Sequence, residues 1–327
     1  MNEAVSIVVP IYKGIDHLDI LLDAIKRQTT LPEEVIFVLS ESDESESIQS
    51  VLAEQIDINV KCKLVDLSYP GKARNIGVDI ASSSWVAFLD LRSIPSRNWL
   101  ESLKNKVDDE AIGIVGAMRT CSADTFYKRI LKAATLGNDS EKSVAGSLVN
   151  THFFRDGNYF LENIRAGEDL EWLDRMSGNT KIVWLEQSIV DYQGLSTNIF
   201  RTIEKYVMYA FENSKIDILK AQKYTYFLVG TILVAMFLYS WNYTFTQGQW
   251  DQSPYFIPHL NKIAWSGLFV MYMLYRGFYR PLLRNERLRF LRSGSWLLIG
   301  ALGICIDLAK APGRLIGFFK SFSKTSK

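Results

Sequence analysis

An adjacent pair of acids, Glu168 and Asp169, opens the amphipathic stretch GEDLEWLDRM. A carboxylate held close to an attacking hydroxyl group can act as a general base and take its proton. Acids in the first turn of a helix also suit the positive end of the helix dipole without doing any chemistry. The pair is therefore a candidate catalytic site, and simple stabilisation of a helix start is the structural alternative.

The segment GKARN, from Gly71 to Asn75, combines a flexible turn with two cations and an amide. Cationic side chains bind phosphate oxygens, and a guanidinium does so in bidentate fashion. The segment lacks the GxxxxGK[ST] pattern of a P-loop. It indicates a cradle for a diphosphate, with Arg74 favoured over Lys72, or else a solvated helix start.

A third candidate follows the apolar run WVAF, where Asp90 is separated by one residue from Arg92. Magnesium and similar cations prefer several oxygen ligands around one ion. Arg92 stands where a second acid would be expected, and its charge would repel a dication. Asp90 is therefore interpreted either as the remnant of a metal site or as part of a site in which Arg92 replaces the metal.

The elements that must position these residues are predicted from short β-branched runs. VSIVVP, EVIFVL and WVAFLD have the pattern of strands buried on both faces of a sheet. They alternate with helical stretches such as DHLDILLDAIKRQT, in which Asp16 is the expected N-cap. The apolar face of that helix comprises Leu18, Leu21, Leu22 and Ile25. The predicted fold class is α/β with a mostly parallel sheet, whose ligands bind beyond the strand ends at Tyr12, Ser40 and Asp90.

Taken in order, VSIVVPIYKG, GKARNIGVDIASSSWVAFLD, IPSRNWLE and RAGEDLEWLDRM resemble the motifs of the family-two glycosyltransferases, over residues 4–212. The resemblance implies a GT-A fold and inverting transfer from a nucleotide-sugar donor. It also implies that Asp169 is the base and that Glu168 positions it or binds the acceptor. The donor-binding residues that it implies are Pro10, Tyr12, Ser40, Arg74, Asn75, Asp90 and Arg92.

The sequence departs from the family pattern at three places around the expected nucleotide and metal site. Leu39 and Ser40 stand where the family has acids after its second strand, and Arg92 interrupts the metal-binding D-x-D. The histidine that many members carry late in the domain is absent from IVDYQG, where Asp191 stands instead. We therefore expect no required cofactor, with Mg²⁺ or Mn²⁺ held by Asp90 and Asp191 as the alternative.

The chain changes character after about residue 220, so we predict a catalytic domain over residues 1–220 and a membrane domain over residues 221–327. Residues 224–241 and 260–279 are long and apolar enough to be transmembrane helices. Residues 280–292 are rich in arginine and predict an amphipathic surface helix. Residues 293–319 predict a third segment, embedded but not fully spanning. A pair of buried core helices is the alternative for the first two.

Charge distribution predicts the orientation and the partners. The loop 242–261 contains no Lys or Arg, whereas residues 280–292 hold five arginines, so the catalytic domain is expected in the cytoplasm. Arg284 and Arg287 would lie near the phosphates of a lipid-linked or other membrane glycan acceptor. A net charge of +1 argues against nucleic acid as a partner. The predicted function is a membrane-anchored glycosyltransferase, and the alternative is a non-catalytic scaffold subunit of a glycan-assembly complex.

Overall fold

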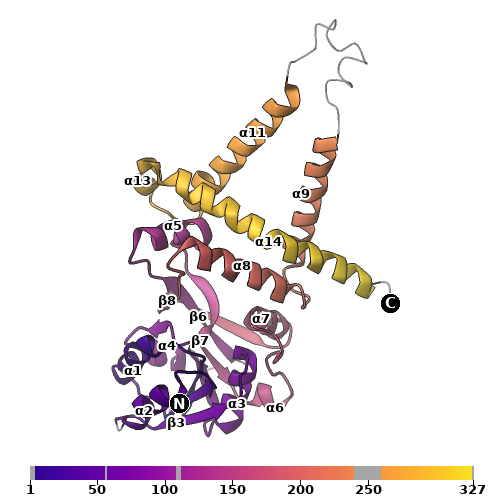
Figure 1. Ribbon diagram of the computed structural model, residues 1–327. Coiled ribbons are helices and arrows are strands. Elements are labelled where there is room, and N and C mark those ends of the chain that lie inside the picture. Colours follow the sequence, from indigo (N-terminus) through magenta and orange to yellow (C-terminus); the bar gives the residue numbers. More distant parts are fainter. Residues whose placement is uncertain (1–3, 56, 108–111, 239–258, 326–327) are drawn as a thin grey trace, which may run out of the picture. The chain divides into compact units, whose positions relative to one another are not determined.

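The computed structural model describes residues 4–55, 57–107, 112–238 and 259–325. The chain divides into two compact units, and Figure 1 shows their helices and strands coloured from the N-terminus to the C-terminus. The sheet unit comprises Met1–Asp124 and Asn138–Ser196, and the helical unit comprises Thr125–Gly137 and Thr197–Lys327. The helical unit thus takes in two segments before residue 220 that the sequence pattern assigns to the catalytic domain.

The sheet unit is built on an eight-stranded mixed sheet with the order β3-β2-β1-β4-β7-β6-β8-β5. The bounds of its first four strands are β1 Val5–Ile11, β2 Glu34–Ser40, β3 Val60–Val65 and β4 Trp85–Phe88. The others are β5 Ser93–Pro95, β6 Ile112–Cys121, β7 Glu141–Asn150 and β8 Lys181–Tyr192. Strands β1 to β4 pair in parallel, and β7 pairs antiparallel with both β4 and β6. The predicted mostly parallel sheet is confirmed.

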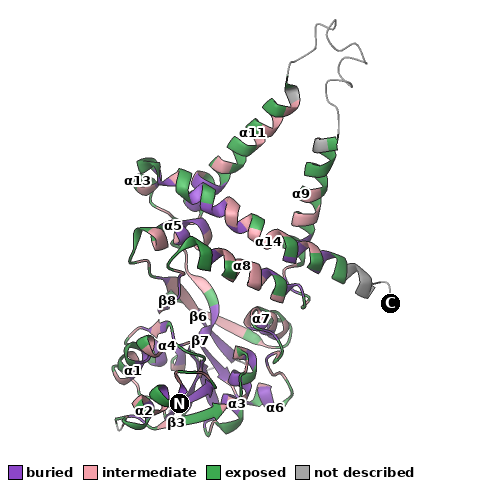
Figure 2. Ribbon diagram, in the orientation of Figure 1, coloured by how far each residue is buried: buried purple, intermediate pink, exposed green. Residues whose placement is uncertain are grey.

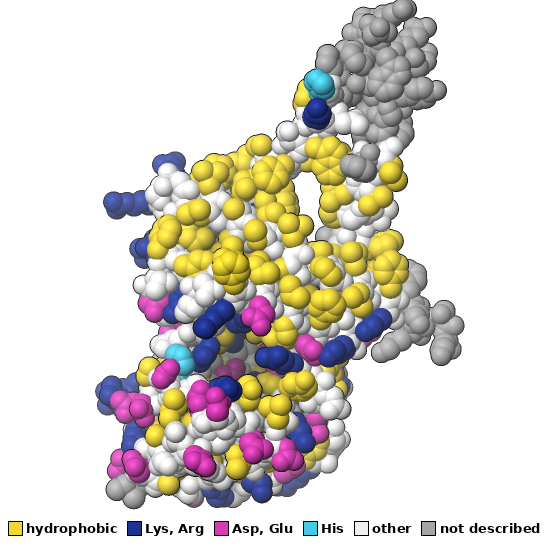
Figure 3. Space-filling model, in the orientation of Figure 1, with side chains coloured by type: hydrophobic (Ala, Val, Ile, Leu, Met, Phe, Trp, Pro, Cys, Tyr) yellow, Lys and Arg dark blue, Asp and Glu magenta, His cyan; other side chains and the backbone are white. Residues whose placement is uncertain are grey.

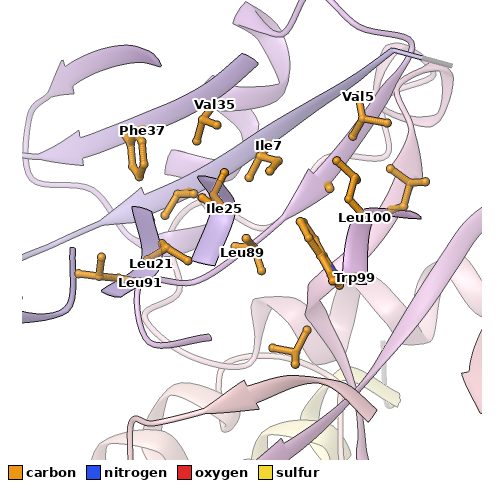
Figure 4. Close-up of a cluster of buried hydrophobic side chains, with 14 of the residues drawn as sticks. Val5, Ile7, Leu21, Ile25, Val35, Phe37, Leu89, Leu91, Trp99 and Leu100 are labelled. Atoms are coloured by element: carbon orange, nitrogen blue, oxygen red, sulfur yellow. The ribbon is translucent and has the colours of Figure 1, made fainter. Parts of the chain in front are cut away.

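Helices cover both faces of this sheet and bury two separate apolar clusters. The cluster on one face joins β1 and β2 to α1 (Leu18–Lys26), α2 (Ser45–Ala53) and α4 (Trp99–Lys104). Figure 4 shows Ile7, Phe37, Leu21 and Trp99 directed into it. The cluster on the other face joins the sheet to α3 (Pro70–Ile80), α6 (His152–Arg155) and α7 (Glu168–Ser177). Strands β1 and β2 are therefore buried on both faces, as their unbroken apolar runs predict.

The first helix confirms one detail of the sequence prediction and corrects another. Its predicted apolar residues are all buried in the structure. Asp16, however, is not its N-cap, because the chain enters through a short 3₁₀ turn at Ile15–His17 and no side chain caps the helix at His17. Glu44 lies between β2 and α2. Its Oε2 accepts hydrogen bonds from the backbone N–H groups of Gly14 (2.6 Å) and Ile15 (3.0 Å), where the 3₁₀ turn begins.

The helical unit contains α5 (Phe126–Thr135), α8 (Ile199–Asn213), α9 (Lys220–Leu238) and α11 (Leu260–Leu274). A π-helical turn η2 (Tyr275–Tyr279) continues α11 into α12 (Arg280–Leu283). The chain then passes through α13 (Leu288–Phe290) and the π-helical η3 (Leu291–Ser295) into α14 (Trp296–Thr325). Helix α14 contacts α5, α8, α9, α11 and η2, so it is the element around which the unit is organised.

Small residues allow these helices to approach closely. A Cβ atom on Gly313 of α14 would lie 2.4 Å from the carbonyl carbon of Ala210 in α8. A Cβ atom on Gly277 of η2 would lie 2.1 Å from the carbonyl oxygen of Trp296. Because α5 and α8 both pack against α14, they belong with the C-terminal helices and not with the sheet.

The two predicted transmembrane spans are helical wherever the structure describes them. The predicted amphipathic helix over residues 280–292 is wrong as one helix, because the chain leaves the helical conformation between α12 and α13, where Asn285 has a φ of 59°. Helix α9 covers residues 224–238 of the first predicted span, and residues 239–258, including most of the predicted outer loop, lie outside the described residues. Residues 260–279 are helical throughout. Among the described residues, one helix, Leu288–Lys320, is long and apolar enough to cross a membrane. Figure 2 shows that α9 and α11 are largely exposed, unlike the strands of the sheet.

Candidate active site

Three of the predicted site residues meet at a single guanidinium. Arg74 of α3 is only 4% exposed, and its Nη2 donates to Oδ1 of Asp90 at 2.8 Å. Its Nη1 donates to Oε1 of Glu168 at 2.8 Å. The ring of Phe160 lies 5.5 Å from the Arg74 guanidinium carbon and covers it. Arg74 therefore ties the end of β4 to the start of α7, and it is bound to two acids where the sequence pattern predicts a diphosphate.

The two acids of the predicted pair have different environments. Gly167 precedes them with φ of 92°, a left-handed conformation that glycine adopts at little cost, and helix α7 begins at the next residue. Glu168 is 4% exposed and bonded to Arg74. Asp169 is only partly buried, and its Oδ1 accepts a hydrogen bond from the backbone N–H of Leu170. Of the pair, Asp169 is thus the acid that can meet a ligand.

Burial and charge act against each other in this network. Burial raises the pKa of Glu168 above its usual value, although the positive charge of Arg74 opposes the change. Burial by itself would lower the pKa of Arg74, but the charges of Asp90, Glu168 and Asp169 outweigh it and raise that pKa. Arg74 is therefore a permanent cation that stabilises the ionised forms of the acids around it.

Asn75 holds the loop before α7 in place. Its Nδ2 donates to the Phe160 carbonyl at 2.9 Å and to Oε1 of Glu162 at 3.1 Å, while its Oδ1 accepts from the Phe160 N–H at 2.9 Å. Nearby, a Cβ atom on Gly71 would lie 2.1 Å from the Leu161 carbonyl oxygen, so only glycine allows this approach. The GKARN segment therefore anchors the loop that leads to the acidic pair.

Asp90 has two arginines for neighbours, one in space and one in sequence. One oxygen of Asp90 is already ion-paired with Arg74, and the exposed side chain of Arg92 brings a second positive charge. Among the described residues, no three His, Cys, Asp or Glu side chains gather as a metal-binding group. Asp90 pairs with Arg74 of α3 and not with its neighbour in the sequence, Arg92. The Arg92 carbonyl instead accepts a hydrogen bond from the backbone N–H of Gln193.

Asp191, the alternative metal ligand, is held by its own neighbours. Its Oδ2 accepts a hydrogen bond from the Ser122 hydroxyl at 2.6 Å and from Nε2 of Gln193 at 3.4 Å. The backbone of Asp191 pairs with Ile94, two residues beyond Arg92. The strand that carries Asp191 thus lies beside the loop that follows Asp90.

The ends of β1 and β2 form a further part of the site. Tyr12 follows β1 and is half exposed, whereas Pro10 lies within the strand and Ser40 is buried at the end of β2. The Ser40 hydroxyl bonds to the carbonyl and the hydroxyl of Ser68, so it holds a loop and does not face solvent. Beside Tyr12, Lys13 pairs with Asp43 at 2.5 Å.

Sequence reasoning does not identify Glu44, which ties the loop after β1 to the loop after β2. The only signal for it is an acid within SESDESES shortly after a strand end.

The two predicted acceptor residues lie in the helical unit. Nη1 of Arg284 donates to the carbonyl oxygens of Thr135 and Leu136, and so it caps the C-terminal end of α5. Arg287 is exposed, and its backbone N–H donates to Oε1 of Glu286 at 3.0 Å. Arg284 therefore has a structural role, and Arg287 is the more accessible of the two cations.

With this geometry described, residues 6–166 match the family model named Glycosyl transferase family 2. This part of the chain is a family 2 glycosyltransferase domain. The chain is therefore a glycosyltransferase, and its sheet unit has the GT-A type of α/β fold. The match ends just before the acidic pair, so Glu168 and Asp169 lie beyond the matched residues. No curated protein matches the chain in sequence.

One solved structure supports the fold of this glycosyltransferase. The mannosyltransferase PcManGT from Pyrobaculum calidifontis, solved with GDP-Man and Mn²⁺, is 14% identical with a TM-score of 0.56. The alignment covers 95% of this chain and 87% of that one. TarS from S. aureus, residues 1–349 solved with UDP-GlcNAc, is 16% identical with a TM-score of 0.47, covering 94% and 92% of the two chains. At these identities the likeness to PcManGT concerns the fold alone.

Proposed function

We propose that the enzyme is a membrane-associated inverting glycosyltransferase in which Asp169 is the base. The acceptor hydroxyl attacks the anomeric carbon of a nucleotide-sugar, and Asp169 takes the hydroxyl proton as that bond forms. The bond between the anomeric carbon and the diphosphate oxygen breaks, and the nucleoside diphosphate leaves with the electron pair. The unequal burial of the acidic pair carries this proposal, because Glu168 is locked to Arg74 while Asp169 remains accessible.

The departing diphosphate gains negative charge, and a fixed cation close to it lowers the barrier. We assign this role to Arg92, whose exposed guanidinium follows Asp90 at the end of β4. Asp90 keeps one carboxylate oxygen for a ribose or sugar hydroxyl while Arg74 holds the other. In this account no metal is required, since two arginines occupy the surroundings in which a dication would otherwise bind.

Membrane association is supported by the exposed apolar side chains of α9 and α11. They include Leu228, Val234 and Leu238 on α9, and Ile263, Phe269 and Met271 on α11. Figure 3 shows hydrophobic side chains crowded over the part of the helical unit that α9, α11 and α14 form. A soluble monomer rarely exposes so large a patch, so lipid is its natural cover. We propose that both helices enter the bilayer and that the sheet unit faces the cytoplasm.

The acceptor proposed for this enzyme is a lipid-linked or other membrane-bound glycan. The exposed arginines that follow α12, among them Arg287 and Arg289, would attract an anionic membrane surface by about 1 kcal/mol each. A catalytic unit that is covalently joined to such helices meets membrane-bound acceptors at high effective concentration.

The experiment that tests this function compares wild-type full-length enzyme in detergent with Asp169→Asn. Asparagine preserves the shape and removes the basicity, so turnover should fall by about two to four orders of magnitude. Donor affinity should stay close to wild type. The control is Glu171→Gln, which removes a negative charge from the same helix and should leave turnover close to wild type. If Asp169→Asn keeps most of the turnover, the base is another residue.

A further inference from the structure

One buried arginine of the helical unit, Arg314, has no hydrogen-bond or ion-pair partner among the described residues. Arg314 of α14 is only 5% exposed, and both Nε and Nη1 of its guanidinium are buried without a hydrogen-bond partner. Burying a charged group without a partner is strongly unfavourable, so buried charges are normally paired. The free donors of Arg314 therefore point to an anion that completes this part of the structure.

The surroundings of Arg314 are strongly cationic. Lys310, one helical turn before it, interacts electrostatically with Arg276, Arg284 and Arg314, and Asp307 is its single acidic partner in that set. Asp307 is already bound to Arg276, with Nε and Oδ2 2.6 Å apart. It also accepts a hydrogen bond at 2.7 Å from the Tyr272 hydroxyl. Asp307 is thus already engaged, and Nζ of Lys310 lies 4.5 Å from the centre of the Tyr206 ring. Among the described residues, no acid pairs with Arg314.

The geometry places Lys310 and Arg314 on one face of α14. Asp307, Lys310 and Arg314 are spaced i, i+3 and i+7, so they lie along the same stripe of the helix. Tyr226 of α9 lies against this stripe, since its hydroxyl is 3.5 Å from Oδ1 of Asp307 and it interacts electrostatically with Arg314. Lysine and arginine offer only hydrogen-bond donors. A cluster of donors with excess positive charge matches an oxyanion such as phosphate.

We propose that Arg314 and Lys310, with Tyr226 beside them, form a binding site for the phosphate group of a lipid. The flanking residues Leu308 and Phe319 of α14 are exposed and apolar, so an attached hydrocarbon chain finds a surface next to the phosphate. Because Nε and Nη1 are covered, a phosphate reaches them only when the Arg314 side chain changes rotamer. The site rests on the proposed membrane association but not on the proposed sugar transfer.

The first test measures lipid binding by full-length protein in detergent, using native mass spectrometry. The probe is a polyprenyl monophosphate, compared with the polyprenol of the same length, phosphatidylglycerol and inorganic phosphate. Arg314→Gln should weaken binding of the polyprenyl phosphate by about 10- to 100-fold, the usual worth of a charge-assisted phosphate contact. Arg292→Gln removes an exposed charge from the same unit and should leave the affinity nearly unchanged.

Comparing the affinities of these four ligands shows which kind of molecule carries the bound phosphate. Equal binding of phosphatidylglycerol, with the same loss in Arg314→Gln, supports the site and assigns it to bilayer phospholipid. A preference for the polyprenyl phosphate supports the site and assigns it to a prenyl-linked lipid. Equal binding of polyprenol, or equal loss in Arg292→Gln, overturns the proposal. Inorganic phosphate that binds as tightly as the lipids overturns the lipid assignment.

A second test separates binding from folding. Arg314→Met removes an unpartnered charge, so the melting temperature in detergent without added lipid should rise. The increase in melting temperature that the polyprenyl phosphate gives to wild type should disappear in this variant. Arg276→Met, which breaks the ion pair with Asp307, is expected to lower the melting temperature. If Arg314→Met lowers it as well, Arg314 is a structural group and the proposal fails. Neither readout needs turnover, so an inactive enzyme would leave this test intact.

Discussion

Arg74 in the sheet unit and Arg314 in the helical unit are almost equally buried, at 4% and 5% exposed, yet they have opposite surroundings. Nε of each arginine lacks a hydrogen-bond partner, but Arg74 is ion-paired with Asp90 and Glu168 through Nη2 and Nη1, whereas Nη1 of Arg314 has no partner either. A buried cation between two acids organises a site from within the protein. A buried cation without an acid implies that the compensating charge comes from a ligand.

Arg276 shows that the helical unit can satisfy a buried arginine. It is 2% exposed, pairs with Asp307, and donates through Nη2 to the Gly303 carbonyl at 3.0 Å. Helix α14 therefore contributes Asp307 to one buried ion pair, and seven residues later it carries Arg314, which pairs with no acid among the described residues. General features of a membrane-associated helix do not explain this difference, so we attribute it to binding.

The largest expected effect comes from removing the paired cation. Arg74→Gln leaves Glu168 and Asp90 without their counter-charge and should destabilise the sheet unit by about 3–5 kcal/mol. Melting followed by tryptophan fluorescence measures this. The double variant Arg74→Gln/Glu168→Gln should recover part of the loss, because no unpaired charge stays buried. If Arg74→Gln and Arg314→Gln change the melting temperature alike, the contrast between the two arginines is wrong.

A buried acid provides the matching case of opposite charge. Glu34 of β2 is 1% exposed. Burial opposes its ionisation, but hydrogen bonds from Lys61, Ser6 and Ser82 outweigh it and lower the pKa of Glu34 from 4.5 to about 2. Because the folded-state pKa is the lower one, the stabilisation is present above about pH 4.5 and is lost as the pH falls towards 2.

Glu34→Gln should therefore cost about 3 kcal/mol of stability at neutral pH. The difference from wild type should shrink below about pH 4.5, because wild-type Glu34 then becomes protonated as well. Glu33→Gln, at the exposed neighbouring position, should change little at any pH. Denaturation at a series of pH values measures both variants. A penalty for Glu34→Gln that stays constant down to pH 2 would show that the carboxylate charge is not the source.

The smallest of the three effects concerns the exposed arginine of the catalytic site. Arg92→Ala should lower turnover by about 10- to 100-fold without changing the melting temperature, because its contact is made to a phosphate. Arg97→Ala removes an exposed charge from the same loop region and should leave turnover unchanged. Equal turnover of the two variants would remove Arg92 from the mechanism.

The fold could be predicted because its signals are local. The β-branched runs of β1 and β2 are buried on both faces, and the apolar face of α1 packs as its spacing predicts. The capping role given to Asp16 is wrong, because α1 begins only at Leu18, after a 3₁₀ turn whose first backbone N–H groups bind Glu44 from the loop after β2. The preference of aspartate for the N-cap position is local, whereas the contact with Glu44 joins residues 30 positions apart and cannot be predicted from sequence spacing.

The site residues were found in the sequence, but their partners were not. Arg74 lies 16 residues from Asp90 and 94 from Glu168 in the sequence, so no local pattern pairs them. Arg284 was expected at an acceptor phosphate because it stands in an arginine-rich segment. In the structure it caps α5, 149 residues away from its Thr135 partner. Arg314 gave no signal, since unpaired burial appears only in three dimensions.

Donor turnover by wild-type full-length enzyme, measured with and without EDTA, tests the central claim that arginines and not a metal supply the positive charge at this site. Release of nucleoside diphosphate reports each turnover. We predict that the enzyme keeps most of its activity in EDTA and gains little from added Mg²⁺ or Mn²⁺. Loss of turnover in EDTA, restored by Mn²⁺ and accompanied by a mild effect of Arg92→Ala, would contradict the account and assign Asp90 and Asp191 to a metal.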